Sequence, residues 1–294
     1  MPTFRRILAT VNPVTLDTSA ARRAAYLAGK LGASLHLHCV VRRHDYAREL
    51  FHLNNSMEQA RQDYVAQAQD HLKQLAGELG VPDTTISSQW RHPFDAGVVE
   101  AIDEYKPDLV VTALRNDDHP STAEWRLVRS CPVPLLVARH REWSESPYLM
   151  ACLDPTHAHD KPADLDRKLV DAAAEIGAGL GVNWHVLHAV GVPPELKGSD
   201  PTPDQFRKEQ EELRTREIRS MLPEDVRRTV ELHFPHTTPV EAISAFADAR
   251  HVDLVVMGSL ARSRIKDLLI GSTLRGMLAS GSCDLLLIHP DKPN

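Results

Sequence analysis

Residues 7–13 read ILATVNP and residues 149–155 read LMACLDP, so a strand-like apolar run that ends in a polar residue and a proline occurs twice in this 294-residue chain. Three further segments recur in the same order: VEAI from Val99 and Val240, DLVV from Asp108 and Asp253, and Ser-Cys with an apolar run from Ser130 and Ser282. The four pairs are 142, 141, 145 and 152 residues apart. A duplicated domain of about 145 residues, lengthened late in its second copy, explains all four spacings.

Each copy alternates short apolar runs with longer stretches of helical spacing, which is typical of βαβ units and a parallel sheet. Strands are predicted at residues 5–12, 34–42, 84–91, 108–114 and 134–139, and again at 148–154, 182–190, 229–235, 253–259 and 284–289. The apolar spacing of residues 57–79 predicts a helix that packs on the sheet, and the charge-rich residues 203–222 predict a mostly solvated helix. Ligand clefts in such folds lie at the carboxyl ends of the strands.

These elements predict an α/β fold of two tandem doubly wound domains, each a five-stranded parallel sheet with helices on both faces. The first domain is predicted at 1–143 and the second at 147–294, joined by a short polar linker near residues 142–147 (EWSESP).

Composition excludes several classes of protein. Hydrophobic residues make up 42% and charged residues 25% of the chain, with no long apolar run, so we expect a soluble protein without a membrane span. The N-terminus shows no signal-peptide pattern, which favours a cytoplasmic location. The net charge is −6 and neither half is basic, which argues against nucleic-acid binding. The four cysteines are scattered and are expected to be buried thiols.

The candidate site follows the fourth strand of the second copy. There Gly258 and Ser259 lead to Ala261 and Arg262, and nine residues separate Ala261 from Gly271-Ser272-Thr273 at the predicted start of the next helix. A glycine at a strand end lets backbone approach a ligand, and a helix start directs free N–H groups and hydroxyls at an anion. The spacing predicts a phosphate cradle, although small residues also cap ordinary helices.

This segment resembles the ATP motif of the universal stress protein family, G-x-x-G-(nine residues)-G-[ST], with Ala261 in place of the second glycine. If that position needs a positive φ, alanine would crowd the loop. The resemblance implies ATP, alone or with Mg²⁺, as the ligand. It also implies that Asp154, at the end of the first strand of this copy, faces the adenosine part, whereas the alternative for Asp154 is a turn residue before Pro155. By position Ala189 would offer a backbone contact to adenine, and Met257 would end the strand beneath the ligand.

The first copy departs from the motif. Its fourth strand runs into Arg115 and residues 116–120 (NDDHP) without a glycine, and Asn12 replaces the aspartate. We therefore expect either no ATP or a different ligand in the N-terminal cleft. Residues 121–135 and 90–94 are similar to the N-terminal domain of the UspE type of tandem stress proteins. The resemblance covers almost the whole chain.

The sixteen histidines invite a metal hypothesis, because several lie close together: His36 and His38, His157 and His159, His185 and His188, and His233 and His236. No third ligand is spaced to complete a set, so no metal site is predicted. His157 and His159 follow Asp154 toward the C-terminal cleft, and His92 and His119 could line the N-terminal one. No nucleophile elbow or Walker A pattern occurs, so no catalytic residue is predicted.

We therefore expect a nucleotide-binding stress-response protein that uses its C-terminal cleft. The alternatives are a slow ATPase or nucleotide-dependent enzyme with Asp154 and nearby histidines as candidate groups, and a binder of another phosphorylated or lipid-like molecule. The resemblance also implies association through last strands, here residues 134–139 with 284–289 in an intramolecular pseudo-dimer about a pseudo-twofold axis. Further homodimerisation is left open.

Overall fold

The computed structural model describes residues 4–12, 17–41, 57–114, 120–156, 164–191, 202–259, 261–262 and 269–290. The chain divides into two compact units, and the division falls between His140 and Arg141. We call them the N-terminal unit and the C-terminal unit, and each is described by itself. The sequence analysis predicted the boundary at residues 143–147.

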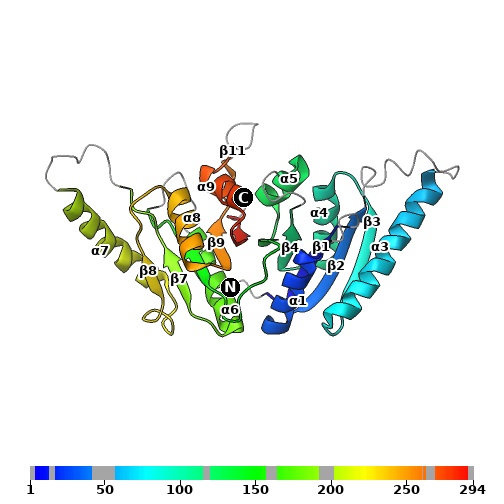
Figure 1. Cartoon of the computed structure of the whole chain (residues 1–294), viewed down its shortest axis with the longest axis horizontal. Helices are drawn as coiled ribbons and strands as arrows, with labels where there is room; N and C mark the ends of the chain where they lie inside the picture. The colour runs from blue at the N-terminus through cyan, green and yellow to red at the C-terminus, as the bar shows by residue number, and fades with distance from the viewer. Residues whose placement is uncertain are drawn as a thin grey trace. The chain divides into compact units, whose positions relative to one another are not determined.

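The N-terminal unit contains a parallel sheet of five strands in the order β3-β2-β1-β4-β5. Its strands are β1 (Arg6–Val11), β2 (Ser34–Val41), β3 (Thr85–Trp90), β4 (Leu109–Ala113) and β5 (Leu135–Ala138). Its helices are α1 (Ser19–Leu31), α3 (Met57–Leu79), α4 (Phe94–Tyr105) and α5 (Thr122–Ser130). Figure 1 shows the helices on both sides of the strands.

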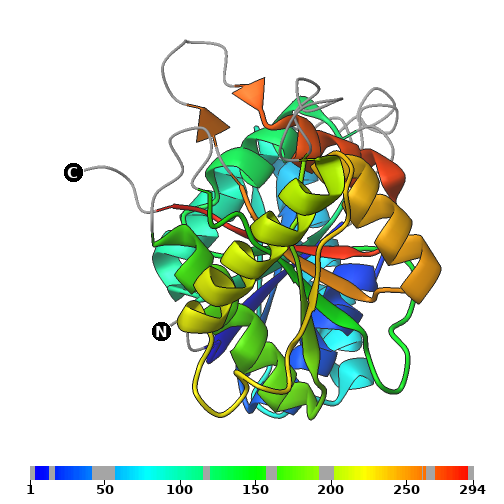
Figure 2. The same cartoon turned by 90° about the vertical axis from the view of Figure 1, so that its left-hand side faces the viewer.

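The C-terminal unit repeats this arrangement with the strand order β12-β9-β6-β7-β8, again parallel throughout. Its strands are β6 (Leu149–Cys152), β7 (Trp184–Leu187), β8 (Glu231–His233), β9 (Leu254–Gly258) and β12 (Asp284–Ile288). Its helices are α6 (Leu165–Leu180), α7 (Pro203–Met221), α8 (Pro239–Arg250) and α9 (Ser272–Ser280). Figure 2 looks onto the β8 side of this unit, with α6 and α7 on one side of the strands and α8 and α9 on the other.

The predicted doubly wound α/β fold is therefore confirmed, and each predicted strand contains a strand of the structure. Both faces of each sheet are covered by helices, so the central strands are buried almost without interruption. The four cysteines form no disulfide, and all but the half-buried Cys152 are buried.

The two helices predicted from spacing and charge are present as α3 and α7. The apolar stripe of α3 is buried at Ala60, Tyr64, Ala68, Leu72 and Leu75. In α7, Ile218 is fully buried and Leu213 is exposed, as a mostly solvated helix requires. No helix in the described part of the chain is long and apolar enough to cross a membrane.

The polar segment predicted as a linker, residues 142–147, lies within a stretch, residues 141–148, that is anchored inside the C-terminal unit. The buried carboxylate of Asp253 accepts hydrogen bonds from the Arg141 guanidinium at 3.0 Å, the Ser144 hydroxyl at 2.9 Å and the backbone N–H of Tyr148 at 2.9 Å. The indole N–H of Trp143 donates to Asp284 at 3.0 Å. These contacts explain why the segment belongs to the C-terminal unit.

Candidate functional site

The predicted phosphate cradle lies between the end of β9 and the start of α9. Two short strands that the sequence analysis did not predict, β10 (Ala261–Arg262) and β11 (Leu269–Ile270), pair antiparallel here. Ala261 pairs with Ile270, the residue before Gly271, so this hairpin joins the β9 end of the motif to its α9 end. The extended backbone of a strand is open to any residue, so Ala261 does not occupy a position that demands glycine.

No side chain in the described residues caps the N-terminus of α9. Gly271 is its N-cap, and its first turn holds no acidic residue. Ser272 is exposed and Thr273 half-buried, and a Cβ added to Gly271 would meet no described atom within 4 Å. The first N–H groups of a helix lack intrahelical partners and carry partial positive charge, so this end of α9 can accept an anion.

Gly258 and Ser259 lie at the end of β9. Gly258 packs against α6, and Ser259 hydrogen-bonds within the sheet. A Cβ on Gly258 would come within 2.9 Å of the Leu165 side chain on α6, so a larger residue here would require that side chain to shift. Met257 is buried, and Ser259 is 2% exposed with its backbone N–H donating to Ile288 of β12 at 2.9 Å. The backbone N–H of Ser259 is therefore already used within the sheet, and a role of Ser259 in ligand binding stays a prediction.

Asp154 follows β6 in a turn. Its Oδ1 accepts hydrogen bonds from the Thr156 hydroxyl at 2.5 Å and the Thr156 N–H at 3.3 Å. Its own N–H donates to Asp166 of α6 at 3.2 Å, and Asp166 is fully buried. Asp154 thus makes the contacts of a turn residue, and its half-buried carboxylate stands at the carboxyl end of β6. A nucleotide contact by Asp154 stays a prediction.

Ala189 lies just beyond β7. The backbone N–H groups of His188 and Val190 donate to His233 and Pro235 on the β8 side. Successive backbone groups of an extended chain point to opposite sides, so those of Ala189 face the β6 side, where Asp154 lies. His188 is buried, and its Nδ1 contacts the Leu153 carbonyl oxygen at 3.0 Å. Burial lowers the pKa of His188 despite that contact and the charge of Asp154.

The corresponding helix of the N-terminal unit, α5, is closed by its own chain. The Ser121 hydroxyl accepts from the Glu124 N–H at 3.3 Å, and the Glu124 carboxylate accepts from the Ser121 N–H at 2.7 Å. Glu124 is 4% exposed, so its charge is held at the helix start. An anionic ligand would have to displace this capping box. The segment 115–119 and the candidates His119, His157 and His159 lie outside the described residues.

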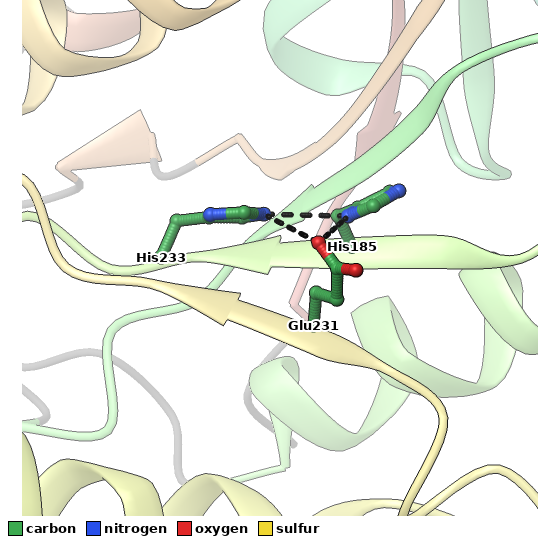
Figure 3. Close-up of side chains that lie close together, drawn as sticks. All are labelled: His185, Glu231 and His233. Carbon is green, nitrogen blue, oxygen red and sulfur yellow. Dashed lines mark hydrogen bonds and ion pairs between the residues drawn. The ribbon is translucent and has the colours of Figure 1, made fainter.

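The histidine pairs read from the sequence are arranged differently in space. His188 and His236 have separate partners, Leu153 and Glu211. Instead His185 on β7 meets His233 on β8, with Nδ1 and Nε2 3.3 Å apart, and Glu231 joins them (Figure 3). The sequence analysis missed Glu231 as the third group. The sequence feature that could have identified Glu231 is its i, i+2 spacing from His233, which puts both side chains on one face of a strand.

The N-terminal unit has a second histidine pair at the equivalent place. His36 and His38 on β2 contact Ser87 on β3 at 2.8 and 2.7 Å, and His36 also contacts Thr85 at 2.7 Å. The ring of Tyr105 stacks on His36 with centroids 3.6 Å apart. Burial lowers the pKa of each histidine to about 4, so both are neutral at pH 7. The hydrogen bonds to Thr85 and Ser87 are a sufficient structural role for these two buried histidines.

Comparison with known proteins identifies relatives of the whole chain. Universal stress protein E of Salmonella typhi and that of Escherichia coli K12 are each 26% identical over 313 aligned positions, which cover 99% of this chain and 96% of theirs. A functionally unknown protein from Pseudomonas aeruginosa PAO1 has a similar fold, with a TM-score of 0.71 at 20% identity over 99% of this chain and 94% of its own.

A universal stress protein from Archaeoglobus fulgidus DSM 4304 gives a TM-score of 0.61 at 14% identity, over 97% of this chain and 98% of its own. The model of the universal stress protein family matches residues 3–139 and again residues 158–289. These two matches agree with the duplication read from the sequence and with the two doubly wound units. The chain therefore belongs to the universal stress protein family, as a tandem of two such domains.

Proposed function

We propose that this protein is a nucleotide-binding stress-response protein that holds ATP, alone or with Mg²⁺, in the C-terminal unit. The observation that carries the proposal is the contrast between the two equivalent helix starts. In the N-terminal unit the start of α5 is occupied by the carboxylate of Glu124, whereas among the described residues the start of α9 has neither a side-chain cap nor an acidic residue in its first turn. A phosphate at the start of α5 would have to displace a carboxylate, whereas at the start of α9 no described carboxylate stands in its way.

In this proposal the phosphates lie against the start of α9, with N–H groups and hydroxyls from Ser272 and Thr273 and with Gly271 leaving room for close approach. Arg262 belongs to β10, which pairs with β11, and β11 ends at the residue before Gly271. The base and sugar would extend over the ends of β6, β7 and β9. The residues proposed there are Asp154, Ala189, Met257, Gly258, Ser259 and Ala261.

The test is a calorimetric titration with ATP, comparing wild type with Gly271→Asp. Each protein is first freed of bound metal with a chelator, and Mg²⁺ is then added to both solutions. The new carboxylate would stand where the phosphates bind. Repulsion between unit charges about 4 Å apart is about 1 kcal/mol in water and about 4 kcal/mol near a protein surface. We expect at least a tenfold loss of affinity. The substitution itself should be tolerated, because Gly271 has φ −55 and ψ 141 and no described atom near its missing Cβ.

The matched control is Thr122→Asp, which adds the same charge at the first residue of α5 in the other unit. Its ATP affinity should equal that of wild type. Gly271→Ala should also bind, because alanine adds one methyl group and no charge. Absence of ATP binding by wild type, or equal affinity of wild type and Gly271→Asp, would refute the proposal.

A further inference from the structure

A group of two histidines and one glutamate lies on the face of the C-terminal sheet that α8 covers. In the parallel pairing of β7 with β8, His185 lies opposite Glu231 and Leu187 lies opposite His233. Glu231 and His233 are two residues apart on β8, so they share a face with His185. Figure 3 shows the three side chains converging from the two strands.

Two of the three separations between the converging atoms match those of ligands around one metal ion, and the third is slightly longer. His185 Nδ1 is 3.3 Å from His233 Nε2 and 3.5 Å from Glu231 Oε2, and His233 Nε2 is 4.0 Å from the same oxygen. Zinc binds nitrogen and carboxylate oxygen at about 2.0–2.2 Å, so two ligands of a tetrahedral ion stand about 3.3–3.6 Å apart. We propose that His185, Glu231 and His233 form a site for a divalent transition-metal ion, with Zn²⁺ as the chemistry they fit best.

The surroundings hold the imidazole rings in place. Tyr148 stacks on His185 with ring centroids 4.2 Å apart, and Phe246 of α8 lies 4.5 Å from the ring of His233. The histidine side chains are 16% and 19% exposed, whereas Glu231 is 69% exposed. The carboxylate can therefore adjust toward an ion with little cost, and an ion can enter from the solvent side.

Nearby charges both favour and oppose the binding of a cation at this site. Glu231 supplies a negative charge, which raises the pKa of both histidines, but burial outweighs it and lowers each pKa overall. Two neutral imidazoles and one carboxylate are a typical ligand set for zinc, with a fourth position left to water. Arg250, whose guanidinium lies over Phe246, opposes a cation. Affinity should therefore be lower than in structural zinc sites with four protein ligands.

The N-terminal unit provides an internal comparison. By strand register, His36 stands where His185 does, and Thr85 and Ser87 stand where Glu231 and His233 do. There both ring nitrogens of His36 contact hydroxyl groups, and His38 shares the Ser87 hydroxyl with it. Within the described part of this unit, Thr85 and Ser87 thus offer hydroxyl groups at the places that Glu231 and His233 take in the other copy. The same backbone site thus carries a hydrogen-bonded histidine in one copy and three convergent metal ligands in the other.

The experiment measures zinc binding by the full-length protein without a histidine tag, after removal of metal with a chelator and in the absence of nucleotide. Wild type is compared with the double variant Glu231→Thr/His233→Ser, which gives the C-terminal unit the residues of the N-terminal one. We expect wild type to bind one more Zn²⁺ per chain in equilibrium dialysis. Histidines elsewhere are the same in both proteins, so the difference reports on this cluster alone.

Two single variants sharpen the result. Glu231→Gln removes a charge from a largely exposed side chain, so it should fold normally, and it should weaken zinc binding at this site by at least about tenfold. His236→Gln is the matched control, because His236 follows the same strand but pairs with Glu211 at 2.8 Å. Equal zinc stoichiometry and affinity in wild type, the double variant and Glu231→Gln would overturn the proposal.

Discussion

The buried histidines of β2, His36 and His38, allow the stability of the N-terminal unit to be perturbed by pH alone. They are 6% and 3% exposed, and their ring nitrogens contact Thr85, Ser87 and Gln89. Burial lowers both pKa values from 6.5 to about 4, and the charge that His36 would carry lowers that of His38 further. Both histidines are therefore neutral in the folded chain over a range in which they are charged in the unfolded chain.

The direction in which pH changes the free energy of unfolding follows from proton binding. Between pH 6.5 and pH 4 the unfolded chain binds protons at these two positions that the folded chain does not, so acid favours unfolding. At pH 5 this amounts to about 2 kcal/mol for each histidine, or about 4 kcal/mol for the pair, relative to pH 7. Typical domains are stable by only about 5–15 kcal/mol, so the loss should be large.

The assay is urea unfolding at pH 7 and pH 5, with hydrogen exchange of β2 amides to follow the N-terminal unit separately. The comparison protein is His36→Gln/His38→Gln, because glutamine can hydrogen-bond to the same hydroxyls but does not titrate. The lower pH should cost the N-terminal unit of wild type about 4 kcal/mol more than it costs that of the variant. If both proteins lose the same stability between pH 7 and pH 5, the reasoning is wrong.

Two further substitutions test the packing of the C-terminal unit by urea unfolding. Asp253→Ala should cost about 3 kcal/mol, because it removes the buried acceptor of the donors in residues 141–148; a loss below about 0.5 kcal/mol would contradict this. Gly276→Ala should cost about 1–3 kcal/mol, because its Cβ would come within 2.6 Å of Val240 on α8. The control Gly29→Ala, whose Cβ would meet no described atom within 4 Å, should be neutral or stabilising.

The fold could be predicted from the sequence because its signals are local and occur twice. The run at residues 149–155 is short, but its match to residues 7–13 fixes it as the first strand of a second copy. The strand ends could be placed only within a few residues, since β8 (Glu231–His233) is shorter than the predicted 229–235. Edge strands are covered less completely than central ones, so their apolar pattern ends less sharply.

The candidate site was predictable only in part. Gly271 was identified as a helix start from motif spacing, and α9 does begin directly after it. The hairpin of β10 and β11 was missed, because strands of two residues carry no periodicity. His185 and Glu231 are 46 positions apart, and only the register of β7 on β8 brings them together. A one-residue shift of that register would put them on opposite faces.

The anchoring of residues 141–148 separates the unit of duplication from the unit of folding. The repeat begins at Leu149, but the carboxylates of Asp253 and Asp284 take hydrogen bonds from Arg141, Trp143 and Ser144 ahead of it. A fragment cut at the start of the repeat would bury two carboxylates without these donors. Anyone who isolates or transplants the second domain should therefore begin at Arg141, eight residues before the homologous sequence starts.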